Sequence, residues 1–92
     1  MDRPPWDPDK ARANLAKHGV TFDDARVAVD HPLARAWPDR RHSTEEERTI
    51  VMGMTPEEHL LVVVVSVEAE GMMRIISARR ATKRERHAYE DR

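Results

Sequence analysis

The sequence contains no cysteine and only three glycines among its 92 residues. The absence of cysteine excludes a disulfide framework, a thiolate zinc site and a cysteine nucleophile. The chain also lacks a glycine-rich phosphate-binding loop, a Gly-x-Ser-x-Gly nucleophile elbow and a His-Glu-x-x-His helix. These absences remove support for nucleotide-cofactor enzymes and for metallohydrolases. The missing cysteines also favour a reducing compartment, and we expect the cytoplasm.

Long hydrophobic segments are missing too. The longest apolar run, 60–65, is too short to span a bilayer, and the first six residues carry prolines and charges where a signal peptide has an apolar core. The five histidines stand far apart without the spacing of metal ligands, so we expect neither a metal site nor a cofactor. The chain length predicts one soluble domain over 1–92 that contacts no membrane.

What the sequence does contain is charge, unevenly distributed. The formal net charge is −1, yet residues 31–73 hold four arginines against eight acids, whereas residues 74–92 hold seven Lys and Arg against three acids. The C-terminal segment is therefore locally positive by about four charges, which suits a phosphate backbone. The same composition is equally typical of a solvated face.

Two helices are predicted in the first third of the chain. The Asp-Pro pair at 7–8 starts the first helix and Gly19 ends it, so this helix covers 8–18. One stripe of the helix carries Lys10, Asn14 and Lys17. Thr21, with an aspartate three residues on, resembles a capping box and opens a second helix to about residue 29. The buried positions predicted for this second helix are Phe22, Ala25 and Val29.

From Leu33 onward the pattern changes to that of strands. The predicted strands cover 33–37, 46–54, 60–67 and 72–79. The third of them is almost entirely β-branched or leucine, which is typical of a central strand buried on both faces. Short turns between consecutive strands imply an antiparallel meander, and a capping box at Thr82 starts a short last helix to about residue 90. The sequence thus predicts an α+β domain with helices on one sheet face and the other face free for a ligand.

Arginines at strand ends are the candidate phosphate-binding groups. Strand alternation places Arg79 on one face together with Ile75, and Arg80 on the other. An arginine at a strand end on an open sheet face can bind a scissile phosphate with two hydrogen bonds and offset the charge that develops there. The alternative is that one of these arginines only pairs with an acid such as Glu85 or Glu47.

Other candidates lie outside the last strand. Arg48 shares a strand face with partly buried groups, so it has either a carboxylate partner or a function. His42, in a charged loop, is exposed enough for proton transfer. Lys10 and Lys17 are solvent-facing cations, and the alternative is that they only solvate the helix. His18 is better explained as a cap on helix carbonyls than as a base.

Three groups of residues spaced along the chain form a recognisable set. The first is Trp6-Asp7-Pro8-Asp9-Lys10 with Asn14, Lys17-His18-Gly19-Val20 and Phe22; the second is Asp39, His42-Ser43 and Glu47-Arg48; the third is Arg74-Ile75-Ile76-Ser77-Ala78-Arg79-Arg80-Ala81-Thr82 with Glu85-Arg86 and Tyr89. In this order they resemble the signature of BrnT toxins over nearly the whole chain. One departure is His31, where many relatives have an acidic residue directly before the proline, and it affects a turn.

The resemblance implies a RelE-like fold and the toxin of a type II toxin-antitoxin system, an endoribonuclease. The implied chemistry is metal-independent attack of the RNA 2′-hydroxyl on its own phosphate. The implied partner is a BrnA-like antitoxin that carries the DNA-binding domain, so the chain meets DNA only indirectly, and a homodimer is left open. On this basis Arg79 and Arg48 are assigned to the phosphate, and His42 or Lys10 to proton transfer. Backbone contacts are assigned to Arg80, Lys83, Arg84 and Lys17.

Two other functions remain open from the sequence. A non-catalytic RNA-binding or co-repressor module would hold phosphates with the same basic end without cutting them. A protein-interaction domain would dock its basic helix on an acidic partner. RNA fragments that bear cyclic phosphate ends distinguish the enzyme from the module, and salt-sensitive RNA affinity counts against the interaction domain.

Overall fold

The computed structural model describes residues 6–40, 47–68 and 70–91. Within these residues the chain forms three helices and a four-stranded antiparallel sheet, which confirms the predicted α+β class. In chain order the elements are α1 (Pro8–His18), α2 (Phe22–Asp30), β1 (Arg35–Pro38), β2 (Glu47–Met54), β3 (Leu60–Val67), β4 (Met73–Arg80) and α3 (Lys83–Glu90). None of the helices in the described residues is long and apolar enough to cross a membrane.

The helix ends follow the capping residues predicted from sequence. The Asp7 side chain accepts a hydrogen bond from the Asp9 backbone N–H before α1, and Gly19 ends the helix with φ 69°. Thr21 accepts from the Asp24 N–H before α2. A complete capping box at Thr82 starts α3, as predicted.

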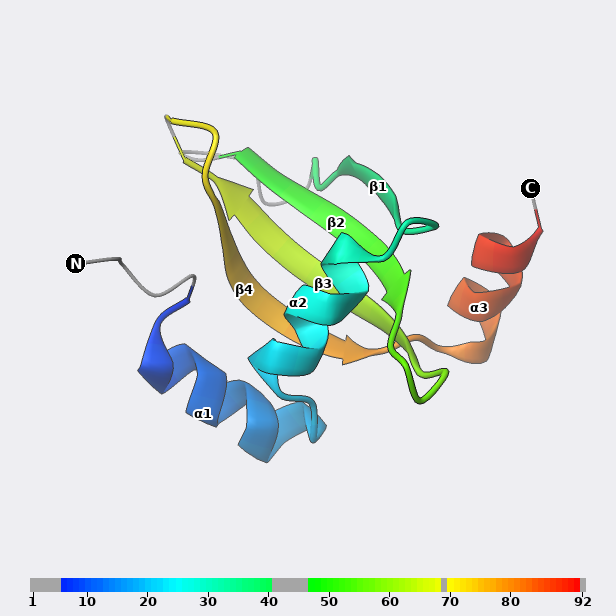
Figure 1. Cartoon of the computed structure of the whole chain (residues 1–92), viewed down its shortest axis with the longest axis horizontal. Coiled ribbons are helices and arrows are strands. Elements are labelled where there is room, and N and C mark those ends of the chain that lie inside the picture. The colour runs from blue at the N-terminus through cyan, green and yellow to red at the C-terminus, as the bar shows by residue number, and fades with distance from the viewer. Residues whose placement is uncertain (1–5, 41–46, 69, 92) are drawn as a thin grey trace.

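The strands run in the order β1-β2-β3-β4, so the predicted meander is confirmed. Figure 1 shows α2 lying across the sheet and α1 beside β4. The main core lies between these helices and the sheet, where Phe22, Ala25 and Ala28 meet Val63, Val65 and other strand residues. Ala28 is buried in place of the predicted Val29, which is only partly buried. Trp6 completes this core by packing edge-on against Phe22, with ring centroids 5.9 Å apart.

Gly53 permits the close approach of α2 to β2. A Cβ atom at this position would lie 1.9 Å from the carbonyl oxygen of Ala28, closer than any real contact. The absence of a side chain at Gly53 is therefore what lets the helix backbone rest directly on the strand.

The second face of the sheet is only partly free, whereas the sequence-based expectation left all of it open to a ligand. Met52, Leu60 and Val62 form a second apolar cluster there, and Tyr89 of α3 packs on it. The Tyr89 hydroxyl also donates a hydrogen bond to the Leu33 carbonyl, at 2.9 Å. The side chains of Met52, Leu60 and Val62 point away from α1 and α2, and α3 covers part of them.

The predicted side-chain alternation along β4 is wrong because the strand is irregular. Ser77 pairs with Val64 but Ile75 pairs with Val65, so β4 carries an extra residue at Ile76. Ile75 and Ala78 consequently both point into the main core. Arg79 lies opposite Val62, on the second face, and does not share a face with Ile75.

Candidate functional site

A buried asparagine holds α1 against β4. The side-chain amide of Asn14 donates to the carbonyls of Val20 and Ala78, and its carbonyl oxygen accepts from the Ala78 N–H at 3.0 Å. Since β4 is an edge strand, Asn14 provides the hydrogen bonds that a neighbouring strand would otherwise make to Ala78. The sequence placed Asn14 on a stripe between two lysines, but gave it no role of its own.

Arg79 forms an ion pair with Glu85. Its Nη1 and Nη2 atoms each lie 2.8 Å from a carboxylate oxygen of Glu85, and Nη1 also donates to the Arg80 carbonyl. Chiefly because of the Arg79 hydrogen bonds, the pKa of Glu85 falls from its ordinary 4.5 to about 2. Of the two acids that the sequence offered as partners, Glu85 pairs with Arg79.

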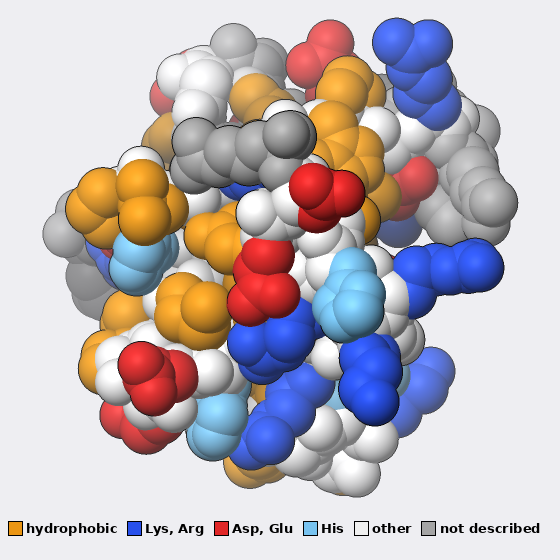
Figure 2. Space-filling view, turned by 90° about the vertical axis from the view of Figure 1, so that its right-hand side faces the viewer, with side chains coloured by type: hydrophobic (Ala, Val, Ile, Leu, Met, Phe, Trp, Pro, Cys, Tyr) orange, Lys and Arg blue, Asp and Glu red, His pale blue; other side chains and the backbone are white. Residues whose placement is uncertain are grey.

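Further cations surround this ion pair at the end of the molecule that carries α3. Arg80, Lys83 and Arg84 are exposed, and Arg80 Nη2 lies 3.3 Å from the Nδ1 atom of His59. We call Arg79, Arg80, Lys83 and Arg84 the α3 cluster. Figure 2, which looks onto this end, shows Lys and Arg side chains gathered on one part of the surface and hydrophobic side chains on another.

Arg48 lies at the other end of the sheet. It pairs across β2 and β3 with Ser66, whereas Arg79 pairs with Val62. Four residues along β3 separate these positions by about 13 Å, and the two arginines stand on strands about 10 Å apart. Arg48 and Arg79 thus lie towards opposite ends of the second face.

Two adjoining cavities lie along the outer edge of β4. One, of about 200 Å³, is lined by polar side chains that include Lys10, Ser66, Glu68 and Arg74. The other, of about 330 Å³, is lined by Lys10, Asn14, Lys17 and His18 together with β4 residues. Because Lys10 and Ile76 line both, we treat the two cavities as one surface and call it the β4-edge trough. The predicted stripe of α1 forms one of its walls.

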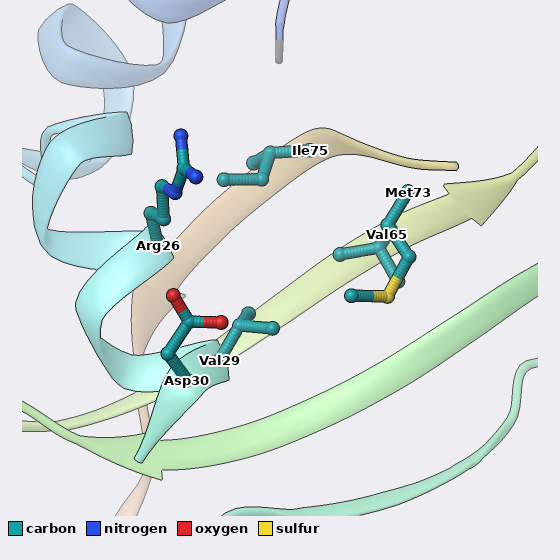
Figure 3. A pocket seen from close by; sticks show the side chains of 6 residues that line it. All are labelled: Arg26, Val29, Asp30, Val65, Met73 and Ile75. Carbon is teal, nitrogen blue, oxygen red and sulfur yellow. The ribbon is translucent and has the colours of Figure 1, made fainter. Parts of the chain in front are cut away.

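A third cavity, shown in Figure 3, lies between α2 and the sheet. Val29, Val65, Met73 and Ile75 make it mainly apolar. Of the described residues that line it, Arg26 alone is a cation, and the carboxylate of Asp30 lies on the same helix. This cavity thus lacks the concentration of positive charge that a phosphate backbone requires.

The remaining sequence-based candidates divide between these regions. Lys10 and Lys17 lie on the β4-edge trough, and Arg80, Lys83 and Arg84 belong to the α3 cluster. His42 lies outside the described residues. Among the residues that the structure describes, no group of three His, Asp or Glu side chains is placed to hold a metal ion. Arg74 and Glu68 were not chosen as site residues from sequence, and only the spatial arrangement of β3, β4 and α1 reveals them.

Comparison with protein families matches residues 6–85 to the ribonuclease toxin BrnT of type II toxin-antitoxin systems. The chain belongs to the BrnT family. It is therefore the toxin of a type II toxin-antitoxin system, as the sequence motifs implied. The BrnT match includes Asn14, Arg48, Arg74, Arg79 and Glu85, so both charged regions lie within the family's part of the chain.

A solved BrnT structure has the same fold. The crystal structure of the Brucella abortus ribonuclease toxin BrnT is similar with a TM-score of 0.64 and 25% sequence identity, over 85% of this chain and 94% of the Brucella chain. None of the curated proteins matches this chain. The BrnT family and its fold are thus established by the family match and this structure together.

Proposed function

We propose that this BrnT-family chain is an endoribonuclease that cleaves RNA in the cytoplasm without a metal ion. The 2′-hydroxyl attacks the adjacent phosphate and leaves a cyclic phosphate and a 5′-hydroxyl. A BrnA-like antitoxin neutralises the chain and makes any contact with DNA. Family membership supports a ribonuclease, and the exposed cations of the α3 cluster are the structural observation that supports binding of a polyanion.

The reaction asks three things of the protein. The RNA backbone must be held in position, protons must move to and from the reacting oxygens, and the charge on the phosphorane must be offset. Arginine and lysine side chains supply the first and third, and Lys10 or His42 supplies proton transfer. None of these roles requires a metal ion.

Because Arg48 and Arg79 lie towards different ends of the sheet, we assign RNA binding to one end and RNA cleavage to the other. For the same reason we do not assign both arginines to one phosphate. Arg79 already uses both Nη atoms on Glu85. We therefore assign the α3 cluster to backbone binding, with Arg80, Lys83 and Arg84 making the contacts. Arg48 and Lys10 belong to the end where RNA is cut.

RNA cleavage by the purified protein tests this function. A 5′-labelled RNA is incubated with the protein in excess EDTA, and the ends of the products are identified. We expect cleavage with cyclic phosphate ends, reduced in Arg48→Ala and less so in Arg79→Ala, with folding of each variant checked by circular dichroism. Arg12→Ala is the matched control, because Arg12 is an exposed arginine of α1 that lines neither charged region. RNA binding without cleavage would instead favour a non-catalytic module.

A further inference from the structure

The β4-edge trough encloses side chains of opposite charge in one cavity. Its polar cavity is lined by the carboxylates of Asp7 and Glu68, the guanidinium of Arg74 and the ammonium group of Lys10, close to the buried Ser66. The α3 cluster also holds a carboxylate, Glu85, which accepts hydrogen bonds from both Nη atoms of Arg79 and from the Thr82 N–H. Polar groups converging on one cavity are the usual mark of a reactive site.

The walls of the trough are fixed by the fold. The extra residue of β4 at Ile76 lies on the trough, and bulges of this kind re-aim side chains at the edges of sheets. As a result Arg74 pairs with Ser66 and lies on the second face. On the opposite wall, the hydrogen bonds between Asn14 and Ala78 hold α1, and with it Lys10, at a set position along β4.

Arg74 differs from Arg79 in how its guanidinium is used. Its Nε atom lies 3.7 Å from Oε1 of Glu68, and no other ion pair of Arg74 occurs in the described residues. The contact with Glu68 orients the side chain but does not engage the two Nη groups. The Nη groups form a planar fork that matches two oxygens of a phosphate.

We infer that the β4-edge trough is where RNA is cut, with the scissile phosphate held between Arg74 and Lys10 and with Glu68 as the base. This inference rests on the proposed ribonuclease function and names its reactive site. Lys17, two helical turns from Lys10 and about 10 Å further along α1, contacts a neighbouring phosphate of the strand.

The step balances without any co-reactant. The Glu68 carboxylate takes the proton of the 2′-hydroxyl, and the 2′-oxygen forms a bond to phosphorus. The bond between phosphorus and the 5′-oxygen breaks, and the leaving oxygen takes a proton from the Lys10 ammonium. The Nη groups of Arg74 offset the added charge on the phosphorane oxygens. Glu68 and Lys10 then regain their starting protonation by exchange with water.

Two measurements on the full chain test the inference. Cleavage of an RNA oligonucleotide is followed as kcat/KM, and binding is measured with the same sequence carrying 2′-O-methyl groups, which cannot react. We expect Arg74→Ala to lower kcat/KM by about 100-fold or more and to weaken binding by about tenfold. Arg74→Lys keeps the charge without the fork and should recover part of the loss. Glu68→Gln should lower kcat by about 100-fold while binding changes by less than about threefold.

The outcomes separate this site from the proposed function. Arg12→Ala again serves as control, and urea unfolding shows that each variant is folded. Cleavage by the wild type together with Arg74→Ala and Glu68→Gln activities within about threefold of Arg12→Ala would overturn the trough as the site and leave the ribonuclease standing. An inactive wild type would overturn both.

Discussion

Arg74 and Arg79 are the same residue type on the same strand and the same sheet face, yet their surroundings differ. At the α3 end, the chain supplies its own carboxylate, and both Nη atoms of Arg79 bind Glu85. At the trough end, the contact between Arg74 and Glu68 runs from Nε to Oε1 and is longer, at 3.7 Å. The first arrangement joins a helix to a strand, and in the second the Arg74 Nη groups make no hydrogen bond within the described residues. Two arginines of one strand can thus differ in which guanidinium atoms are available, and our proposal for Arg74 depends on that difference.

Removal of the Asn14 side chain, at the trough end, should lower the free energy of unfolding more than any other substitution considered below. Asn14→Ala leaves the buried N–H and C=O of Ala78 without partners, which we expect to cost about 2–4 kcal/mol of unfolding free energy. Urea unfolding measures this loss. A loss no greater than that of Arg12→Ala would show that Asn14 does not hold α1 in place.

We expect Arg79→Ala to lower the unfolding free energy more than Arg74→Ala does, whereas Arg74→Ala should lower RNA cleavage more. Arg79→Ala should lower the unfolding free energy by about 1 kcal/mol, a modest value because the ion pair is partly exposed. Arg74→Ala should cost about 0.5 kcal/mol or less, since its contact with Glu68 is long and single. Equal losses in urea unfolding would remove the distinction between the two ends.

The Arg79 ion pair should also make stability depend on pH. The pKa of Glu85 is about 2 in the folded chain against an ordinary 4.5, so its contribution is complete above pH 4.5 and is lost as the pH falls towards 2. Glu85→Gln removes the charge but keeps a side chain able to cap α3. The difference in unfolding free energy between wild type and Glu85→Gln should therefore shrink steadily from pH 4.5 to pH 2. A constant difference would contradict the ion pair.

Lys17 should give the smallest effect. Lys17→Ala removes one phosphate contact, so the slope of log affinity against log salt for the 2′-O-methyl RNA should fall in magnitude by about 0.7. Filter binding at several salt concentrations measures this slope. Lys83→Ala provides the same comparison at the α3 end, and an unchanged slope for Lys17→Ala alone would restrict RNA binding to that end.

Much of the fold was predictable because its signals are local. The bounds of β3 and the caps at Asp7, Gly19 and Thr82 follow from residues next to each other in sequence. The Arg79 and Glu85 pair was foreseen as an alternative for the same reason, since only six residues separate them. The site was less predictable, because it depends on pairing between distant segments.

Two features of the structure could not be predicted from neighbouring residues in the sequence. The extra residue at Ile76 exists only in the register of β4 against β3, so alternation counted along β4 alone gave the wrong face for Arg79. Asn14 and Ala78 are 64 positions apart, and no pattern in either segment predicts their contact. Arg74 and Glu68 could not be recognised as neighbours of Lys10 from the sequence, because only the pairing of β3 with β4 and the position of α1 place the three on one cavity.

The hydrogen bonds between Asn14 and Ala78 have a consequence for how copies of this chain meet. A β-sheet with an open border can recruit a strand from another molecule and so begin templated growth. At Ala78 of β4, the backbone N–H and C=O that would receive such a strand already bind the Asn14 side chain. At the opposite border, Pro38 has no N–H to offer. The Asn14 amide at one edge of the sheet and Pro38 at the other therefore disfavour hydrogen bonding to a strand of another molecule.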